Sequence, residues 1–391
     1  MKRLWKRSDL RKTNKCKKRI KILQSSLVEE KVFSVQQKLD EATTFPQERI
    51  CVISKNGKIV EKAGLTILRE PPKFSTTKQW VVVPDPDQLK NDDVVLVQPH
   101  HKRLWVIFRR GSNSNSLFVT SACNSNCLMC PQPPKEKDDV SYSSLLQQIQ
   151  CLPDSVEEIC VTGGEPTILG TKFIEILKTV KNKNPACSVH VLSNARLCKD
   201  KTFVNQMKSV GLENLTFGIP LYSSIPECHD YIVQSKGAFD ETIEGIYNLA
   251  GAGIGVEIRI VLHKQTIKGL GLLADYIYNK IPYVRHVAFM AMEHMGYVKR
   301  NWDLLWVHPL DYKEQLLAAV RFLYIRGVNV SIYNLPYCLC DKRMWGFLRQ
   351  SISDYKVDFN EECEKCALKG KCCGLFHYQR EVMEVKRISA L

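Results

Sequence analysis

The sequence predicts an α/β protein built around an open or partial (βα)6 barrel. Three observations predict it. Between residues 113 and 334, apolar runs alternate with helical patterns, as buried parallel strands alternate with crossover helices. Residues 31–112 instead hold short apolar runs divided by turn signals, which indicates a small β-rich N-terminal domain. From residue 335 to 391, six of the 16 cysteines gather among loops, which indicates a Cys-rich extension.

The charge distribution bears on the partners of the chain. The net charge is +15, but residues 1–21 alone contain eleven Lys and Arg and a single acid. The excess is therefore concentrated in a basic arm, residues 1–30, which we expect to be flexible. The rest of the chain is nearly balanced, so nucleic acid is not an expected partner.

The cysteine content bears on the compartment. The basic arm has no apolar h-region, and no run of about 18 apolar residues occurs, so we expect a cytoplasmic protein without membrane contact. Cysteines stay reduced in that compartment. The 16 cysteines of the chain therefore indicate bound metal or clusters rather than disulfides.

The β-rich domain is predicted from four short strands, at 51–54, 80–83, 93–97 and 103–108. Turn signals such as Asn56-Gly57 separate them. No catalytic constellation is visible in this domain. Its position suggests that it docks a peptide by strand addition.

The barrel is predicted from strands and helices in strict alternation. The strands are expected at 116–120, 157–162, 187–193, 214–219, 256–262 and 285–291, with one more at 328–333. The helices are expected at 142–151, 171–182, 201–210, 239–252, 268–279 and 311–326. The strands read as apolar runs, which predicts burial on both faces. Functional groups should then lie in loops after the carboxyl ends of the strands.

A loop after the first barrel strand carries three cysteines. Cys123, Cys127 and Cys130 are spaced C-x₃-C-x₂-C directly after the apolar run 117–120. So tight a loop can direct three thiolates at one point. Three ligands suit a [4Fe–4S] cluster with one open iron, or an incomplete zinc site.

Polar residues follow three later strands. Gly163, Gly164 and Glu165 follow the second strand, where they suit a ligand carrying an ammonium group or form an ordinary turn. Ser193 and Asn194 follow the third and could reach a ribose hydroxyl or cap the next helix. In the fifth strand Glu257 and Arg259 point to the same side, where Arg259 could bind a carboxylate or pair with an acid on a neighbouring strand.

A second cysteine group lies near the carboxyl end. Cys363, Cys366 and Cys372 have C-x₂-C-x₅-C spacing, and Cys338 upstream supplies a fourth thiolate. Four thiolates suit an auxiliary [4Fe–4S] cluster or a structural zinc, and the spacing does not distinguish them. Cys340 and Cys373 are additional cysteines that are either substitute ligands or packed thiols.

Together, the triple-cysteine loop, the Gly-Gly-Glu-Pro turn and the Ser-Asn strand end resemble the radical S-adenosylmethionine (SAM) superfamily. The resemblance implies a TIM-like barrel and a [4Fe–4S] cluster on Cys123, Cys127 and Cys130, with SAM on the open iron. It implies that Gly163, Gly164 and Glu165 hold the methionine ammonium, that Ser193 and Asn194 hold the ribose, and that Met129 lies near the adenine. It implies reductive cleavage of SAM to a 5′-deoxyadenosyl radical that abstracts hydrogen from a substrate.

At finer grain the chain resembles the His-Xaa-Ser system radical SAM maturases of the HxsC type. The resemblance rests on segments 114–120, 127–134, 191–194, 218–223, 229–231, 237–242, 256–263 and 351–356. It implies a small ribosomally made peptide with His-Xaa-Ser repeats as substrate, a companion radical SAM maturase and an electron donor. The chain departs from this pattern at Ala195 and Cys373, where glycine is expected, and at the extra Cys340.

Two other functions fit part of the sequence. The basic arm would suit a radical SAM enzyme that modifies RNA or nucleosides. Zinc at both cysteine groups would make the chain a non-catalytic interaction protein.

Overall fold

The computed structural model describes residues 19–36, 50–54, 63–73, 75–112, 115–350 and 357–376. Most of the basic arm, residues 1–18, and the segment 351–356 lie outside these ranges. The chain divides into two compact units between Ser112 and Asn113, and each is described by itself. No helix in the described ranges combines the length and the apolar character needed to cross a bilayer.

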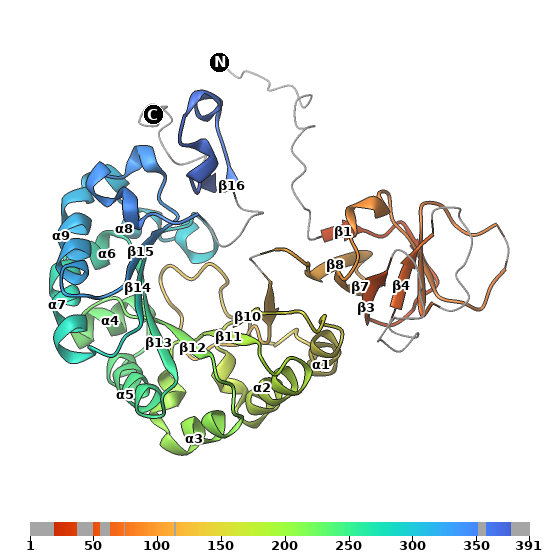
Figure 1. The fold of residues 1–391 in the computed structure, drawn as a ribbon, viewed down its shortest axis with the longest axis horizontal. Helices are drawn as coiled ribbons and strands as arrows, with labels where there is room; N and C mark the ends of the chain where they lie inside the picture. The colour runs from red at the N-terminus through yellow and green to blue at the C-terminus, as the bar shows by residue number, and fades with distance from the viewer. Residues whose placement is uncertain are drawn as a thin grey trace. The chain divides into compact units, whose positions relative to one another are not determined.

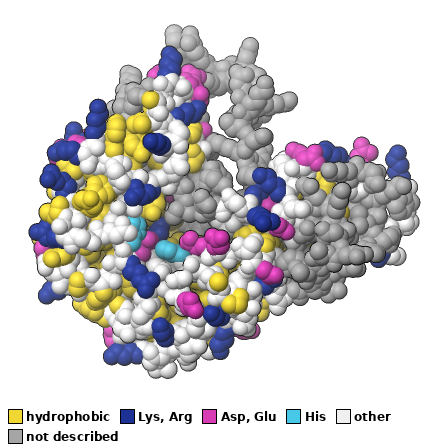
Figure 2. Space-filling model, viewed as in Figure 1, with side chains coloured by type: hydrophobic (Ala, Val, Ile, Leu, Met, Phe, Trp, Pro, Cys, Tyr) yellow, Lys and Arg dark blue, Asp and Glu magenta, His cyan; other side chains and the backbone are white. Residues whose placement is uncertain are grey.

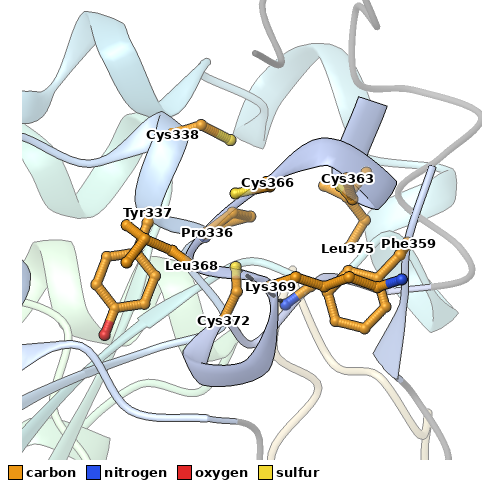
Figure 3. A pocket seen from close by; sticks show the side chains of 11 residues that line it. Pro336, Tyr337, Cys338, Phe359, Cys363, Cys366, Leu368, Lys369, Cys372 and Leu375 are labelled. Carbon is orange, nitrogen blue, oxygen red and sulfur yellow. Dashed lines mark hydrogen bonds between the residues drawn. The ribbon is translucent and has the colours of Figure 1, made fainter. Parts of the chain in front are cut away.

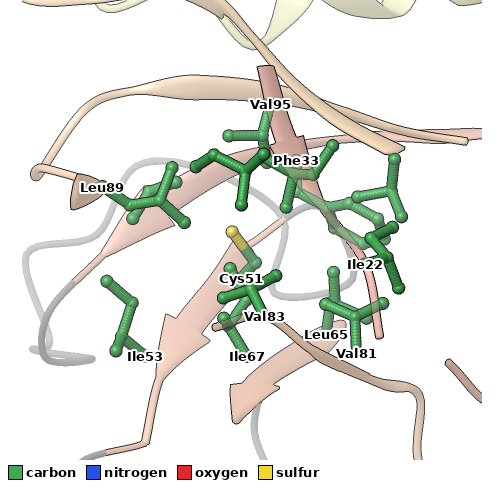
Figure 4. Packing of buried hydrophobic residues seen from close by; sticks show 14 of the residues in the cluster. Ile22, Phe33, Cys51, Ile53, Leu65, Ile67, Val81, Val83, Leu89 and Val95 are labelled. Atoms are coloured by element: carbon green, nitrogen blue, oxygen red, sulfur yellow. The ribbon is translucent and has the colours of Figure 1, made fainter. Parts of the chain in front are cut away.

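The N-terminal unit is a single mixed sheet around an apolar core. Its strands, in the order β1-β8-β7-β3-β4-β5-β6-β2, are β1 (Arg19–Lys21), β2 (Gln24–Ser25), β3 (Lys31–Gln36), β4 (Ile50–Ile53), β5 (Leu65–Leu68), β6 (Trp80–Val82), β7 (Val94–Gln98) and β8 (Arg103–Phe108). Phe33, Cys51, Leu65 and Val95 meet inside this sheet and are almost completely buried (Figure 4).

The two end strands of this sheet belong to one continuous stretch of chain. β1 pairs with β8, and β2, three residues later, pairs with β6. Between them, Ile22 donates its N–H to the Lys102 carbonyl and Leu23 donates to the Val82 carbonyl. The stretch 19–25 therefore closes the sheet on itself. The stretch 19–25 occupies one edge of β8 and one edge of β6, and peptide docking by strand addition in this unit stays a prediction.

The four strands predicted in this unit are confirmed as β4, β6, β7 and β8. The strands β1, β2, β3 and β5 were not predicted. β1 and β2 span three and two residues, too few to show a pattern. In β5 all four residues are buried, so its sequence Leu-Thr-Ile-Leu lacks the alternation that marks a half-buried strand.

The second unit is a parallel sheet that curls into a half-barrel (Figure 1). Its strands follow the chain order from β9 to β15: β9 (Ser116–Phe118), β10 (Glu158–Thr162), β11 (Ser188–Leu192), β12 (Leu215–Pro220), β13 (Gly255–Leu262), β14 (His286–Ala291) and β15 (Val330–Tyr333). All are parallel to their neighbours. The α/β barrel prediction is therefore confirmed, including the additional strand at its end.

Helices connect the strands and cover the outer face of the sheet (Figure 1). They are α1 (Tyr142–Gln150), α2 (Thr171–Lys183), α3 (Lys201–Ser209), α4 (Pro226–Val233), α5 (Ala238–Gly251), α6 (Lys264–Ile267), α7 (Leu270–Lys280), α8 (Trp302–Leu305) and α9 (Lys313–Tyr324). The six predicted helices are confirmed as α1, α2, α3, α5, α7 and α9. The short helices α4, α6 and α8 were not predicted, because four to eight residues show little helical periodicity.

The prediction that the strands are buried on both faces is wrong for the inner face. Along β13, Ile258 and Ile260 are fully buried, whereas Glu257 and Arg259, which alternate with them, are half-buried. The helices cover the outer face of the curled sheet and leave its inner face uncovered. Polar side chains can therefore occupy the inside of the half-barrel, and Figure 2 shows histidine beside acidic and basic side chains on the open face.

The cysteine-rich end of the chain consists of short 3₁₀ turns and a two-stranded antiparallel sheet. The turns are η7 (Tyr337–Leu339), η8 (Lys342–Phe347), η10 (Glu361–Lys365) and η11 (Lys369–Lys371). The sheet pairs β16 (Val357–Asp358) with β17 (Leu375–Phe376). A bridge between Ile332 and Leu348 connects this region to β15.

Candidate active site at the carboxyl ends of the strands

The triple-cysteine loop follows β9 and is fastened at several points. Asn126 donates its N–H to the Val233 carbonyl (3.0 Å), and Leu128 donates to the Ile232 carbonyl (2.9 Å), both at the end of α4. On the other side, Asn301 donates its side-chain N–H to the Leu128 carbonyl (2.8 Å). These contacts come from segments far apart in the sequence, so the barrel as a whole holds the loop.

The three loop thiols lie close enough to influence one another. Burial raises the pKa of Cys123 to about 11, and it also raises the pKa of Cys127 and Cys130. For Cys123 and Cys127, the neighbouring thiols raise the pKa further. Three adjacent thiolates in such a loop need a cationic group between them. Iron supplies that charge, so the donor set fits an iron–sulfur cluster.

The turn after β10 packs directly against the cysteine loop. A Cβ atom at Gly164 would lie 2.1 Å from the Ala122 carbonyl oxygen, and one at Gly163 would lie 2.5 Å from that of Thr120. Gly164 donates its N–H to Thr120 (2.7 Å), and Glu165 donates its own to Ala122 (2.8 Å). Both glycines therefore permit a backbone contact that a side chain would block.

Glu165 is the centre of a buried network. Its Oε1 accepts from Thr167 Oγ1 (2.6 Å) and Ser193 Oγ (2.7 Å), and its Oε2 accepts from the Asn194 N–H (2.6 Å). Burial raises the pKa of Glu165, and these hydrogen bonds act in the opposite direction. Asn194 in turn donates its side-chain amide to Asn124 Oδ1 (2.7 Å) in the cysteine loop. The structure thus brings together Glu165, Ser193 and Asn194, all predicted from strand ends.

Arg259 and Met129 lie apart from that network. Arg259 donates to Glu257 Oε1 (2.8 Å) of its own strand and to Met290 Sδ (3.2 Å). Within the described ranges no hydrogen bond joins it to Glu165, Ser193 or Asn194. Arg259 is therefore paired with an acid, but the acid belongs to its own strand and not to a neighbouring one as the alternative had it. Met129 is 5% exposed in an apolar cluster that includes Tyr222 and Met292.

Glu257 connects several side chains on the inner face of the barrel. Besides Arg259, it accepts from His286 Nδ1 at 2.8 Å, and His190 Nε2 lies 3.7 Å from its Oε1. Burial alone would raise the pKa of Glu257. The hydrogen bond from His286 and the charge of Arg259 outweigh burial and lower this pKa to about 2, so Glu257 is ionised at neutral pH.

Two polar residues near the cysteine loop were not predicted. Asp138 accepts from the N–H (3.0 Å) and Oγ (2.9 Å) of Ser121 and from Thr120 Oγ1, so it fastens the start of the loop. Arg196 contacts the loop from the turn after β11. The signal for Arg196 is its place two residues after Asn194 of the Ser-Asn strand end, whereas nothing in the spacing of Asp138 indicates its role.

The second cysteine group surrounds a single pocket (Figure 3). Four of its lining residues are Cys338, Cys363, Cys366 and Cys372, the cysteines that the spacing selects. Cys340 and Cys373 are buried and do not line the pocket.

In the part of the chain that the structure describes, no set of three or more His, Cys, Asp or Glu side chains is arranged as a site for one metal ion.

Comparison with known proteins agrees with this site. Residues 117–277 match the model of the radical SAM superfamily. A GTP 3′,8-cyclase of Campylobacter fetus is 26% identical over 65% of this chain and 76% of its own. A probable GTP 3′,8-cyclase of Methanocella arvoryzae is 28% identical over 72% of this chain and 92% of its own. An Fe-coproporphyrin III synthase of Methanosarcina barkeri is 27% identical over 55% of this chain and 53% of its own.

Among solved structures, native anSMEcpe with bound AdoMet superposes with a TM-score of 0.50 at 16% identity, over 70% of this chain and 92% of that one. This likeness supports the fold alone. The relatives differ in the reactions that their names state, so the matches do not identify a substrate. The chain is an enzyme whose residues 117–277 match the radical SAM superfamily, which uses a [4Fe–4S] cluster with SAM.

Proposed function

We propose that this enzyme uses Cys123, Cys127 and Cys130 to hold the cluster and modifies a ribosomally made peptide. The observation that carries the cluster assignment is the C-x₃-C-x₂-C loop, which hydrogen bonds from the end of α4 and from Asn301 hold in place. When bound, the cluster and SAM supply one-electron chemistry at the mouth of the barrel. The residues of the chain fasten the loop, orient SAM and exclude competing ligands.

The SAM contacts follow from the network around Glu165. Its Oε2 accepts one hydrogen bond in the structure, so it retains capacity for an ammonium donor. Gly163 and Gly164 keep this carboxylate next to the loop. Ser193 and Asn194 present oxygen atoms to the ribose, and Met129 contributes apolar surface for the adenine. Arg259, oriented by Glu257, is the candidate partner for the SAM carboxylate.

We assign the C-terminal pocket to an auxiliary [4Fe–4S] cluster on Cys338, Cys363, Cys366 and Cys372. The support is that one pocket gathers these four thiols and leaves out the other two cysteines of the region. Four thiolates complete the coordination of such a cluster. A cluster with no open iron is suited to electron transfer rather than to binding a substrate.

The peptide substrate rests on the sequence segments shared with the His-Xaa-Ser system maturases, with a companion maturase and an electron donor as further partners. The second candidate is a nucleotide or nucleoside substrate. It is favoured by the two relatives named as GTP 3′,8-cyclases, one of which matches 92% of its own length.

One set of anaerobic measurements tests these assignments. Reconstituted protein should contain about eight iron atoms per chain if both clusters are present, and about four if one is. It should cleave SAM to 5′-deoxyadenosine when reduced. Addition of a His-Xaa-Ser repeat peptide should stimulate cleavage and change the mass of the peptide, whereas GTP should do neither. Turnover of GTP without any change in the peptide would replace the first substrate by the second.

A further inference from the structure

Arg196 connects the cysteine loop to a helix on the outside of the barrel. It begins the 3₁₀ turn η4 (Arg196–Lys199), which Ala195 separates from the Ser193–Asn194 strand end. Its Nη1 donates to the Asn124 carbonyl (2.5 Å) and to Ser125 Oγ (3.0 Å), both between the first and second cysteines. Its side chain is 11% exposed, so the guanidinium is largely shielded from water.

Glu241 fixes the orientation of Arg196 from the first turn of α5. The Arg196 Nε donates to Glu241 Oε2 at 2.7 Å. Helix α5 can approach because of Gly245, where a Cβ atom would lie 2.1 Å from the Ala195 carbonyl oxygen. A guanidinium fork can engage a carboxylate and a loop carbonyl together, whereas an ammonium lacks this planar geometry.

The charge of Arg196 lies beside the cysteine loop. Its Nη1 contacts two residues, Asn124 and Ser125, that stand between Cys123 and Cys127. Charges that are several ångström apart in a partly buried site interact more strongly than in water. Lys199 shares Glu241 with Arg196, donating to its Oε1 at 2.6 Å, but the Lys199 side chain is 45% exposed.

We propose that Arg196 is a positioning residue that clamps the 123–127 segment, and that its fixed positive charge raises the reduction potential of the cluster held there. One-electron reduction of a [4Fe–4S] cluster adds a negative charge to it, and a neighbouring cation stabilises that state. The proposal rests on the proposed function, because it requires a cluster on Cys123, Cys127 and Cys130.

The test is an anaerobic redox titration of the reconstituted full chain, followed by electron paramagnetic resonance with dithionite as the electron source. In Arg196→Gln the equilibrium constant for reduction should fall about tenfold, a downward shift of about 59 mV for one electron. Arg196→Lys should keep a reduction potential close to that of the wild type, because lysine retains the positive charge. Both variants should lose iron to a chelator faster than the wild type, because neither side chain can bind Glu241 and the loop carbonyl at the same time as the guanidinium does. The matched control, Lys199→Gln, should leave both measurements unchanged.

Each outcome has a definite meaning. A loaded Arg196→Gln protein with wild-type potential and wild-type iron retention would overturn the proposal, and so would an equal shift in Lys199→Gln. If Arg196→Gln does not load, loading of Arg196→Lys supports the need for the charge. Failure of both with a wild-type melting temperature supports the clamp, whereas a melting temperature low enough to explain the loss overturns it. A wild type that never loads a cluster contradicts the proposed function instead.

Discussion

The cysteine loop after β9 and the cysteine pocket near the carboxyl end both gather thiols, but different kinds of contact hold them. The loop is fastened by the β10 turn, the end of α4, Asn301 and Arg196, all distant in sequence. In the pocket, Cys366 and Cys372 end the short turns η10 and η11, and the Asn360 side chain caps Cys363 from three residues away. The first site is therefore built by the barrel, whereas the second depends more on the group it binds.

The largest expected effect is on SAM cleavage, which should depend on the cysteine loop but not on the cysteine pocket. Cys127→Ala should abolish SAM cleavage, because two thiolates do not hold the cluster that binds SAM. Cys366→Ala should also remove about four iron atoms per chain but leave SAM cleavage measurable. Iron analysis and quantification of 5′-deoxyadenosine test this pair. Loss of SAM cleavage in Cys366→Ala equal to that in Cys127→Ala would mean that the two sites are not separate.

Removal of iron should affect the two regions unequally. In chelated protein, amide hydrogen exchange across residues 357–376 should accelerate roughly tenfold or more, because short turns lose the group that joins them. Residues 123–130 should change less, since backbone hydrogen bonds from the barrel remain. Mass spectrometry of peptides from loaded and chelated protein measures both. Equal acceleration in the two regions would show that the barrel does not hold residues 123–130 more firmly than residues 357–376 are held.

A glycine in each region offers a matched pair. Gly164→Ala places a Cβ atom 2.1 Å from the Ala122 carbonyl oxygen, so the loop must move. We expect a loss of about 3 kcal/mol in the free energy of unfolding, together with reduced iron in the first site. Gly370→Ala, in η11, meets no atom within 4 Å and should change neither. Denaturant unfolding and iron analysis compare them. A harmless Gly164→Ala would show that the loop is not held as closely as described.

Asp138 provides a smaller and pH-dependent effect. Its hydrogen bonds with Ser121 and Thr120 lower its pKa below 3.8, against the effect of burial. Because the folded-state pKa lies below the unfolded one, the stabilisation is present at neutral pH and is lost as the pH falls below about 3.8. Asp138→Asn should therefore lower the free energy of unfolding by about 1 kcal/mol at pH 7, and it should change this free energy hardly at all at acid pH, where the carboxylate is protonated. Unfolding curves at several pH values measure the difference, and a cost independent of pH would exclude the carboxylate as its origin.

The smallest expected effect concerns Ala195, which stands where the resemblance to the His-Xaa-Ser maturases leads us to expect glycine. Its φ of 58° lies in the left-handed region, which costs an alanine about 1 kcal/mol relative to glycine. Ala195→Gly should raise the free energy of unfolding by up to about 1 kcal/mol, less the entropy that glycine adds to the unfolded chain. Thermal unfolding tests this. A destabilised Ala195→Gly would mean that the buried methyl group packs better than its backbone strain suggests.

Much of the fold followed from local pattern. The alternation of apolar runs and helices predicted the barrel, and cysteine spacing selected Cys338, Cys363, Cys366 and Cys372 before the structure placed them in one pocket. Contacts between distant segments could not be predicted in this way. The clamp of Arg196 depends on Glu241, 45 residues later, and on the approach of α5 through Gly245. The closure of the N-terminal sheet by two strands of two and three residues left no periodic signal.

That closure has a consequence for the order of folding. Arg19 pairs with Trp105, so the first described strand waits for the last strand of its unit to be synthesised. The stretch 19–25 also needs β6, which arrives earlier. Contacts so distant in sequence slow folding, because a long loop must close before they form. During translation this unit is therefore expected to remain incomplete until β8 has left the ribosome, with its core residues accessible to chaperones.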